Sequence, residues 1–460
     1  MNEEKNKRKK QIVRTAYTLL ILAGSLCILG FFMAGRRGQM PQSETDRALR
    51  AAAVKLAEFP EEPIYKSDEE RYENRKTVPE AFAAACQEFG VQTGSAVLKD
   101  AKSNIVYSPL GLYFSLAVAA EGAEGETRKE LLNLLGYPYA ENLSADAKEA
   151  FEAIYHVPNE KNNKKDEFGE YPAESRYCLR LATSLWADED LGLKETFSGH
   201  AAQYFYADSF EGDLQTEKMQ TLMADWVKDR TGGVLALPNT ASGAEELLSL
   251  RNVVYFYDEW LDRFQVEATK TDSFMRRDGS EVSCEFMNRR EESHAFRKGE
   301  NFTSSRVSLK SGSVLFILPD EGVDVHELVK SPKALSAVLY EDGGKTTGEV
   351  IWKIPKFSYG SHVELSGILK DLGIKKAFSD ADFSNISDVS PLFLSQITQN
   401  VHIGIDENGV EATAFTELSW AGAAMPVGRA EMILDRPFLY AVFHRGQVLF
   451  LGICEDPTQE

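Results

Sequence analysis

The 460-residue sequence lacks the motifs of the common catalytic and metal-binding sites. It contains no HExxH, no GxSxG and no glycine-rich loop ending in GK[ST], and this argues against the enzyme classes that carry these motifs. Each of the seven histidines is explained more simply as a surface or core residue than as a ligand. The acidic run Asp188–Asp190 lacks the ligand spacing of a calcium loop. We therefore expect no catalytic activity, no metal site and no cofactor.

Cysteine is scarce and has no paired spacing. The five cysteines, at positions 27, 86, 178, 284 and 454, show no CxxC. Cys27 lies in an apolar run, which leaves four that could pair. We expect these four to be mostly buried thiols, and one disulfide among them stays open: Cys86, Cys178, Cys284 and Cys454.

Positive charge is also in short supply. The chain has 51 basic and 71 acidic residues, a net charge of -20. Such a field repels phosphate backbones, which argues against nucleic acid as a partner. We found no internal repeat and no low-complexity tract. The length is compatible with one large mixed domain that has a single core.

One long uncharged run is present near the N-terminus. Residues 15–34 contain no charged side chain, and 20 helical residues span about 30 Å of hydrocarbon. Basic residues are concentrated in residues 1–14, whereas only Arg36 and Arg37 follow the run. The basic N-terminus is therefore expected in the cytoplasm. We predict a signal-anchor helix over 15–34, with the rest of the chain outside the cell membrane.

Two alternatives are open for this run. A cleaved signal peptide would give a secreted protein, but cleavage after Ser25 would leave the apolar sequence LCILGFFMAG at the new N-terminus. A lipoprotein start at Cys27 is disfavoured by Leu26, which stands where a small residue is required. Residues 35–79 are polar and charged, with one short helix candidate, DRALRAAAVKLAEF. They predict a linker or stalk that holds a folded domain off the membrane.

The folded domain is predicted over residues 80–460. Its patterns place helices mainly first and strands mainly later, which is typical of an α+β class. Phe82, Cys86 and Phe89 have helical spacing. Ser108 and Pro109 indicate a helix start, with serine as the cap and proline at the first helical position. Residues 156–177 form a charged stretch without periodicity, which we expect to be a surface loop.

The stretch DENGVEATAFTELSWAGAAMP, residues 406–426, alternates after a single glycine. One face is small or apolar and the other is polar except for Phe415. No proline or glycine interrupts residues 410–421, so a central strand is possible. An ordinary strand followed by a loop explains these residues equally well. The first face comprises Val410, Ala412, Ala414, Thr416, Leu418 and Trp420.

This stretch resembles the hinge and reactive loop of the serpins, a superfamily of protease inhibitors. An acidic pair, a glycine and small residues stand where that family has them: Glu407, Gly409, Glu411, Ala412 and Ala414. Residues 104–136 resemble the helical signature of the family, and SLRNVVYFYDEWLDRF resembles a strand of its central sheet. The resemblance covers residues 80–460. It implies helices around a large central mixed β-sheet with an exposed reactive loop. Together with the anchor predicted over 15–34, it suggests a membrane-anchored, bacterial-type member of the family.

The resemblance implies a monomeric inhibitor of extracellular serine proteases, not an enzyme. In this mechanism the protease nucleophile forms an acyl-enzyme with a bait bond. The cleaved loop then inserts as a strand and drags the protease with it. The hinge and inserting residues are Glu407, Gly409, Val410, Glu411, Ala412, Thr413 and Ala414. The alternative is a non-inhibitory serpin-fold binding or structural protein, for which the hinge offers no inward-facing charge or proline.

The resemblance also places the bait bond. In the family the bond follows the fourteenth residue after the hinge glycine, which gives Ala423 and Ala424. No lysine or arginine occurs between Val410 and Gly428, so an elastase-like protease that prefers small residues is expected. A shift of one to three residues would bring Met425 or Trp420 to the bond and suit a chymotrypsin-like enzyme.

The family opens its sheet at a polar cluster, for which the resemblance gives Ser108, Asn252, Gln399 and Trp260. Gln399 replaces the usual histidine and Gly111 replaces a second serine. A glutamine can donate and accept hydrogen bonds without titrating. Val410 stands where threonine or serine is usual, and Phe415 is bulky for this region. These departures concern the rate of opening and leave the fold unaffected.

Overall fold

The computed structural model describes residues 44–61, 70, 74–157, 177–231, 233, 247–341, 343–410 and 428–459. The chain divides into two compact units, residues 1–48 and Leu49–Glu460. Only residues 44–48 of the first unit are described, so the predicted basic N-terminus and the anchor at 15–34 lie outside the described residues. The described part contains no helix that is both long and apolar enough to cross a membrane.

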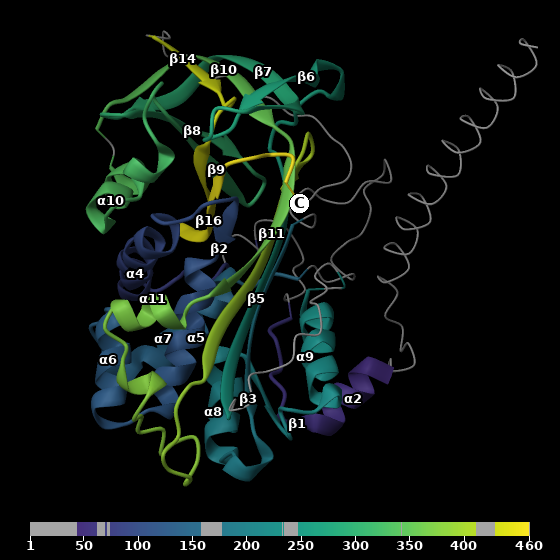
Figure 1. Cartoon of the computed structure of the whole chain (residues 1–460), viewed down its shortest axis with the longest axis vertical. Helices are drawn as coiled ribbons and strands as arrows, with labels where there is room; N and C mark the ends of the chain where they lie inside the picture. The colour runs from purple at the N-terminus through teal and green to yellow at the C-terminus, as the bar shows by residue number, and fades with distance from the viewer. Residues whose placement is uncertain are drawn as a thin grey trace, which may run out of the picture. The chain divides into compact units, whose positions relative to one another are not determined.

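The second unit has helices around two large β-sheets, and the α+β class predicted from the sequence is confirmed. Figure 1 shows α5–α8 gathered along one face of the long strands β3 and β5, and α9 on the other face. The α-helices are α2 Glu44–Ala52, α4 Glu80–Leu98, α5 Pro109–Gly122, α6 Gly125–Leu135, α7 Leu143–Ile154, α8 Glu195–Phe205, α9 Glu217–Arg230, α10 Pro332–Tyr340 and α11 Ser366–Asp371.

The first sheet has seven strands in the described residues, in the order β1-β4-β3-β5-β13-β12-β11. It is mixed: β5 is antiparallel to β3 but parallel to β12. Its central strands are buried on both faces over much of their length, which suits their β-branched and aromatic content. The strands are β1 Ala53–Lys55, β4 Ala207–Glu211, β3 Cys178–Ala187, β5 Leu248–Glu259, β13 Gly409–Val410, β12 Gln396–Ile405 and β11 Phe357–Glu364.

The second sheet has nine described strands, in the order β14-β10-β7-β8-β9-β15-β16-β2, with β6 paired to β7. Helices α4 and α5 pack against β16 and so connect this sheet to the helical layer. The strands are β14 Arg429–Ile433, β10 Lys345–Pro355, β7 Glu281–Lys298, β8 Phe302–Ser308, β9 Gly312–Pro319, β15 Phe438–His444, β16 Gln447–Cys454, β2 Ile105–Tyr107 and β6 Lys270–Met275.

The helix start predicted at Ser108 and Pro109 is confirmed. Ser108 is the N-cap of α5, and its hydroxyl oxygen accepts a hydrogen bond from the Gly111 amide at 3.1 Å. Helix α4 also forms where the spacing of Phe82, Cys86 and Phe89 predicts it, and it buries Phe82 and Phe89 in the core. Both helices are therefore positioned by local sequence signals.

The prediction of a single helix over residues 46–59 is wrong beyond Ala52. Helix α2 ends there, and Ala53–Lys55 form strand β1, which pairs antiparallel with β4 at the edge of the first sheet. The alanine-rich sequence favours a helix locally, but the free edge of β4 supplies backbone partners that only a strand can use. Part of the predicted stalk therefore belongs to the compact unit.

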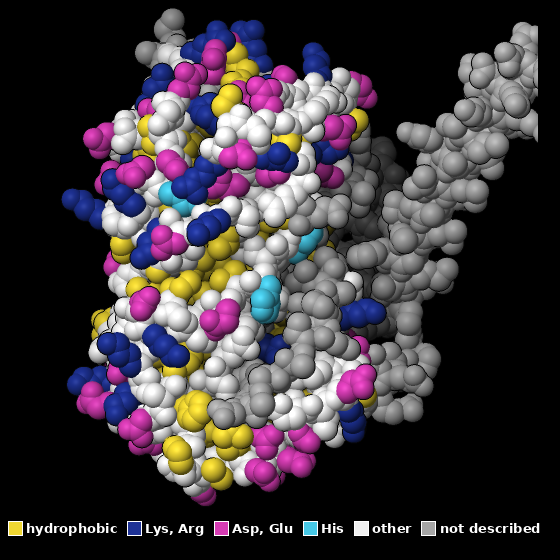
Figure 2. Space-filling model, in the orientation of Figure 1, with side chains coloured by type: hydrophobic (Ala, Val, Ile, Leu, Met, Phe, Trp, Pro, Cys, Tyr) yellow, Lys and Arg dark blue, Asp and Glu magenta, His cyan; other side chains and the backbone are white. Residues whose placement is uncertain are grey.

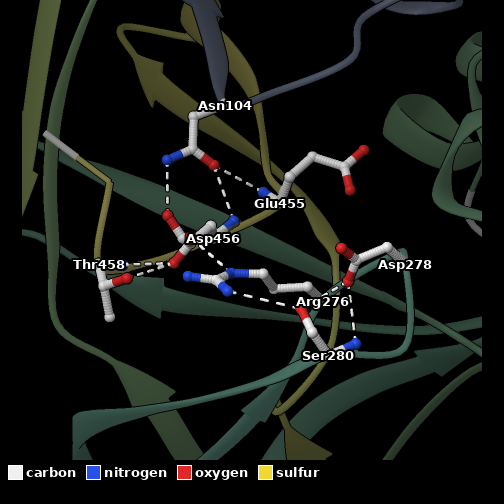
Figure 3. Close-up of polar contacts among 7 residues, drawn as sticks. All are labelled: Asn104, Arg276, Asp278, Ser280, Glu455, Asp456 and Thr458. Atoms are coloured by element: carbon white, nitrogen blue, oxygen red, sulfur yellow. Dashed lines mark hydrogen bonds and ion pairs between the residues drawn. The ribbon is translucent and has the colours of Figure 1, made fainter.

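The C-terminal end of β16 is fixed by side chains from distant parts of the chain (Figure 3). The Asn104 amide oxygen accepts from the amides of Glu455 (2.7 Å) and Asp456 (2.9 Å). Arg276 donates to the Asp456 carboxylate at 2.7 Å, and the Thr458 hydroxyl donates to the same group at 2.6 Å. These contacts hold the chain end close to β6 and β2.

Candidate functional site

The predicted hinge begins a strand inside the first sheet. Gly409 lies opposite Glu259, and Val410 lies opposite both Asp258 of β5 and Ile405 of β12. The Val410 side chain is only 1% exposed. Beyond β13 the gap is closed, because β5 and β12 pair directly from residues 249 and 396 to residues 254 and 401. The sheet thus contains the first two residues of an inserted strand. The position that the rest of this strand would occupy is closed, because β5 and β12 pair with each other there.

Gly409 is required by close packing as well as by chain flexibility. A Cβ atom at this position would lie 2.3 Å from the Asp258 carbonyl oxygen and 2.7 Å from the Glu259 Cα. Both neighbours are backbone atoms of β5 and cannot rotate away. Its φ of +156° is also one that other residues rarely adopt. Any larger residue would push the hinge out of the sheet.

The turn before the hinge is held by Trp260. Its indole Nε1 donates to the Asp406 carbonyl at 2.8 Å, and its backbone amide donates to the Asn408 carbonyl at 2.9 Å. The Asp406 carboxylate accepts from the amides of Asn408 (2.8 Å) and Gly409 (3.3 Å). Trp260 therefore lies under the hinge, apart from the other residues predicted to share its polar cluster.

Glu407 connects the hinge to the start of β11. Its carboxylate is largely buried, accepts from the Thr269 hydroxyl at 2.7 Å and lies 3.3 Å from the Lys356 ammonium. Burial opposes ionisation, but the hydrogen bond from Thr269 and the charge of Lys356 prevail and lower the pKa of Glu407. The ionised carboxylate therefore holds the hinge in place.

Sequence reasoning missed a buried ion cluster behind the hinge. Glu259 is fully buried at the end of β5, with the Lys310 ammonium at 2.5 Å and the Arg263 guanidinium at 3.1 Å. The only available signal was the pair of acidic residues before Trp260, which looks like a polar turn. The cluster fixes the end of β5 where Gly409 pairs with it, since removing one partner of a buried pair is costly.

Asp258, directly opposite Val410, is the second buried acid at this end. Its carboxylate accepts from the amide (2.8 Å) and hydroxyl (2.7 Å) of Ser311 and from the Glu259 amide (2.9 Å). Burial raises the pKa of Asp258 to about 6, although the hydrogen bonds from Ser311 oppose this shift. The hinge is thus seated against a carboxyl group that titrates near pH 6.

The structure brings three of the predicted cluster residues together. The Gln399 amide oxygen accepts from the Ser108 backbone amide at 2.6 Å, while Nε2 donates to the Ser108 carbonyl (2.9 Å) and to the Asn252 Oδ1 (3.2 Å). Asn252 in turn donates to Thr183 on β3 at 3.2 Å. A buried chain of neutral hydrogen bonds therefore crosses β12, β5 and β3 where the sheet is closed.

The remaining predicted site residues lie outside the described residues. These are Glu411, Ala412, Thr413, Ala414, Trp420, Ala423, Ala424 and Met425, all within 411–427. The charged stretch predicted as a surface loop is likewise undescribed over 158–176. The four described cysteines, Cys86, Cys178, Cys284 and Cys454, are free thiols.

Charges of both signs are interspersed on the described surface that Figure 2 shows. Several basic residues of the second sheet are paired with acids, for example Arg290 with Glu349 at 2.5 Å and Lys353 with Asp272 at 2.6 Å.

Comparisons with known proteins agree with this geometry. A family model described as Serpin (serine protease inhibitor) matches residues 84–457. Serpin A3-6 of Bos taurus is 29% identical over 370 residues, which cover 79% of this chain and 85% of that protein. The thermophilic serpin tengpin in the native state matches with a TM-score of 0.69 and 25% identity over 90% of this chain and 98% of that one. Arabidopsis AtSerpin1 in its native stressed conformation matches with a TM-score of 0.70 and 23% identity over 83% and 98%. The fold implied by the sequence resemblance is confirmed.

Proposed function

Because the chain belongs to the serpin family, we propose that it is a suicide-substrate inhibitor of extracellular serine proteases. The cleaved loop inserts between β5 and β12 and carries the covalently bound protease with it. The observation that carries this proposal is the seating of Gly409 and Val410 at the end of a closed β5–β12 pair. The chain is an inhibitor and not a catalyst, because the chemistry belongs to the nucleophile of the target.

The observed register supports insertion of the next residues. Because β13 is antiparallel to β5, each step forward along the loop is a step back along β5. If insertion continued this register, Ala412 would lie opposite Phe256 and Ala414 opposite Val254, and both of these β5 side chains are buried. The charge-free face of the loop therefore coincides with the most buried positions of β5, as a new central strand requires.

The opposite face of the loop meets a less buried surface. In the same register the inserted Glu411 would lie opposite Tyr257 and Glu417 opposite Arg251, and both of these β5 residues are half-buried. Opposite charges directly across a strand pair stabilise it by about 0.2–1 kcal/mol. Phe415 also falls on this face, so its bulk does not block the inward positions.

Insertion also offers a new partner to the polar cluster. Thr416 is the polar residue of the inward face, and a strand that continued the register of β13 would bring it between Asn252 of β5 and Gln399 of β12. Opening the sheet separates these two amides, which are hydrogen-bonded to each other at 3.2 Å. The threonine hydroxyl can donate and accept in their place. About ten new ladder hydrogen bonds, at about 1 kcal/mol each, drive the change.

The bait bond in this proposal is Ala423-Ala424, with Met425 or Trp420 as alternates. The small residues around it and the lack of a basic residue before Gly428 support an elastase-like target. A chymotrypsin-like target is the second candidate. A trypsin-like pocket, which needs a cation for its buried carboxylate, is expected to reject the loop.

The test is to mix the protein with elastase-like, chymotrypsin-like and trypsin-like proteases. We expect a complex with the elastase-like enzyme that survives denaturant, and a released fragment that begins at Ala424. Cleavage of the loop should also raise the melting temperature, because the uncleaved state is held by a kinetic barrier. Cleavage with no covalent complex and no rise in melting temperature would support the non-inhibitory alternative instead.

A further inference from the structure

Residues 53–55, which precede the family match, form strand β1 at the edge of the first sheet. The match begins at residue 84, whereas β1 pairs with the outer edge of β4, with Ala53 opposite Phe210 and Lys55 opposite Ser209. The segment 53–59, which we call the strap, therefore lies outside the residues that the family model matches. Its contacts show what it holds.

The strap is bonded to a buried carboxylate that also holds α9. The Ala57 amide donates to the Asp208 carboxylate at 2.9 Å. Asp208 lies on β4, is fully buried, and accepts from the Trp226 indole and the Arg230 guanidinium of α9, each at 2.7 Å. Without the strap, one donor to this buried anion is lost, which is unfavourable in a dry environment.

Phe59 attaches the strap to the helices on the opposite side of the sheet. Its ring centroid lies 5.3 Å from that of Tyr155, just after α7, and 6.1 Å from those of Phe151 in α7 and Tyr206 at the end of α8. The Arg230 guanidinium of α9 lies over the same ring at 4.8 Å. One phenyl ring therefore contacts helices from both faces of the sheet.

These contacts connect strands that would move during loop insertion to helices that would stay in place. Insertion must separate β5 from β12, and β4 and β3 belong with β5 on one side of that gap. Helix α7 packs on α4 and α5, which pack on β16 of the second sheet. The strap thus ties the outer edge of the opening half to the helical body.

We propose that the strap holds the first sheet closed and prolongs the lifetime of the uncleaved, active form. Its physiological meaning rests on the proposed inhibitory function, but the tie itself does not. Loss of the strap lowers the barrier to sheet opening, so the uncleaved loop inserts spontaneously and the molecule becomes inactive and more heat-stable.

The test uses the full chain with Phe59→Ala and, as a matched control, Glu58→Ala, whose side chain is exposed on the same segment. The proteins are incubated at raised temperature and sampled for covalent complex formation and melting temperature. We expect the active half-life of F59A to fall at least about tenfold, with a growing heat-stable fraction, while E58A matches the wild type. Hydrogen exchange at residues 207–211 should accelerate in F59A alone.

Equal half-lives for F59A, E58A and wild type would overturn the proposal. If F59A fails to fold, Phe59→Leu decides the matter, because it keeps apolar volume but loses the aromatic contacts; it must still shorten the half-life relative to E58A. If the wild type forms no covalent complex with any protease, the heat-stable fraction and the hydrogen exchange still report the strap. Failure of the inhibitory function is therefore distinguishable from failure of the strap.

Discussion

The absence of a side chain at Gly111 leaves room for the buried amide groups of Asn252 and Gln399. A Cβ atom on Gly111 would lie 2.2 Å from the Asn252 Oδ1 and 3.0 Å from the Gln399 Nε2. The space beside the first turn of α5 is thus filled by two amide groups that hydrogen-bond to each other. The Cγ2 atom of Val254 would also lie 2.9 Å from the added atom, so three buried side chains leave no room for a side chain at position 111.

We predict that Gly111→Ser destabilises the uncleaved protein. The added atoms must displace a buried amide pair, and overpacking of this kind costs about 1–3 kcal/mol. The melting temperature should fall by a few degrees. Gly199→Ser is the matched control, because Gly199 lies in α8 and a Cβ atom added there would meet no atom of a neighbouring element within 4 Å. A G111S protein as stable as G199S would contradict the packing argument.

Asp258 gives the protein a pH dependence that can be separated from that of its other acids. Its pKa is raised from 3.8 to about 6 in the folded state, so the folded state binds the proton more tightly than the unfolded chain. The resulting stabilisation is fully present below about pH 4 and is lost as the pH rises through 6. We predict that Asp258→Asn removes this component, as seen in melting temperatures from pH 4 to 7.

The control for that experiment is Asp262→Asn, whose side chain is 69% exposed on the turn after β5. Its profile should follow the wild type. If the D258N profile is parallel to both, Asp258 does not titrate in this range.

At the scale of elements, substitutions on the two faces of the proposed inserting strand test its register. Val410 is buried against β5 and β12. Val410→Arg would bury a guanidinium opposite Asp258, whose carboxyl group is already hydrogen-bonded to Ser311, at a cost of several kcal/mol. We predict that V410R is cleaved as a substrate, with the yield of covalent complex at least about tenfold lower. Glu411→Arg, on the opposite face of the same strand, should keep most of the complex. Equal losses in both variants would rule out the register.

The same register predicts a role for Thr416. Thr416→Val keeps the shape but removes the hydroxyl that would bond to Asn252 and Gln399, leaving two buried amides unsatisfied. We expect slower insertion and therefore more cleaved, uncomplexed inhibitor on a denaturing gel. Thr413→Val, on the other face, is the control and should behave like the wild type. A T416V protein that matches T413V would show that the hydroxyl is not used.

The sequence predicted those helices whose ends and spacing depend on residues close together in the chain. The capped start of α5 at Ser108 and the spacing in α4 are examples, and the hinge glycine was predicted as well. Strand β1 could not be predicted, because its partner β4 is about 150 residues away in the sequence and its own residues favour a helix. The ion cluster around Glu259 was missed for the same reason: Lys310 comes from the turn between β8 and β9, about 50 residues along the chain.

At the scale of the whole molecule, the remaining prediction concerns attachment. We propose that residues 15–34 anchor the chain with the serpin domain outside the cell, and the uncharged run and its basic flank support this. Full-length protein should fractionate with membranes and resist extraction by high salt. A soluble protein that begins after Ser25 would establish secretion and replace the anchor with a signal peptide.

Strand β1 joins the first sheet at the end toward which the cleaved loop would insert. Ala53 is in register, through Phe210 and Trp186, with Ser249, which lies ten residues along β5 from Glu259 at the hinge, or about 33 Å away. The inserting loop runs toward this same end. A protease carried by the cleaved loop would therefore arrive at the end of the first sheet where β1 pairs with β4.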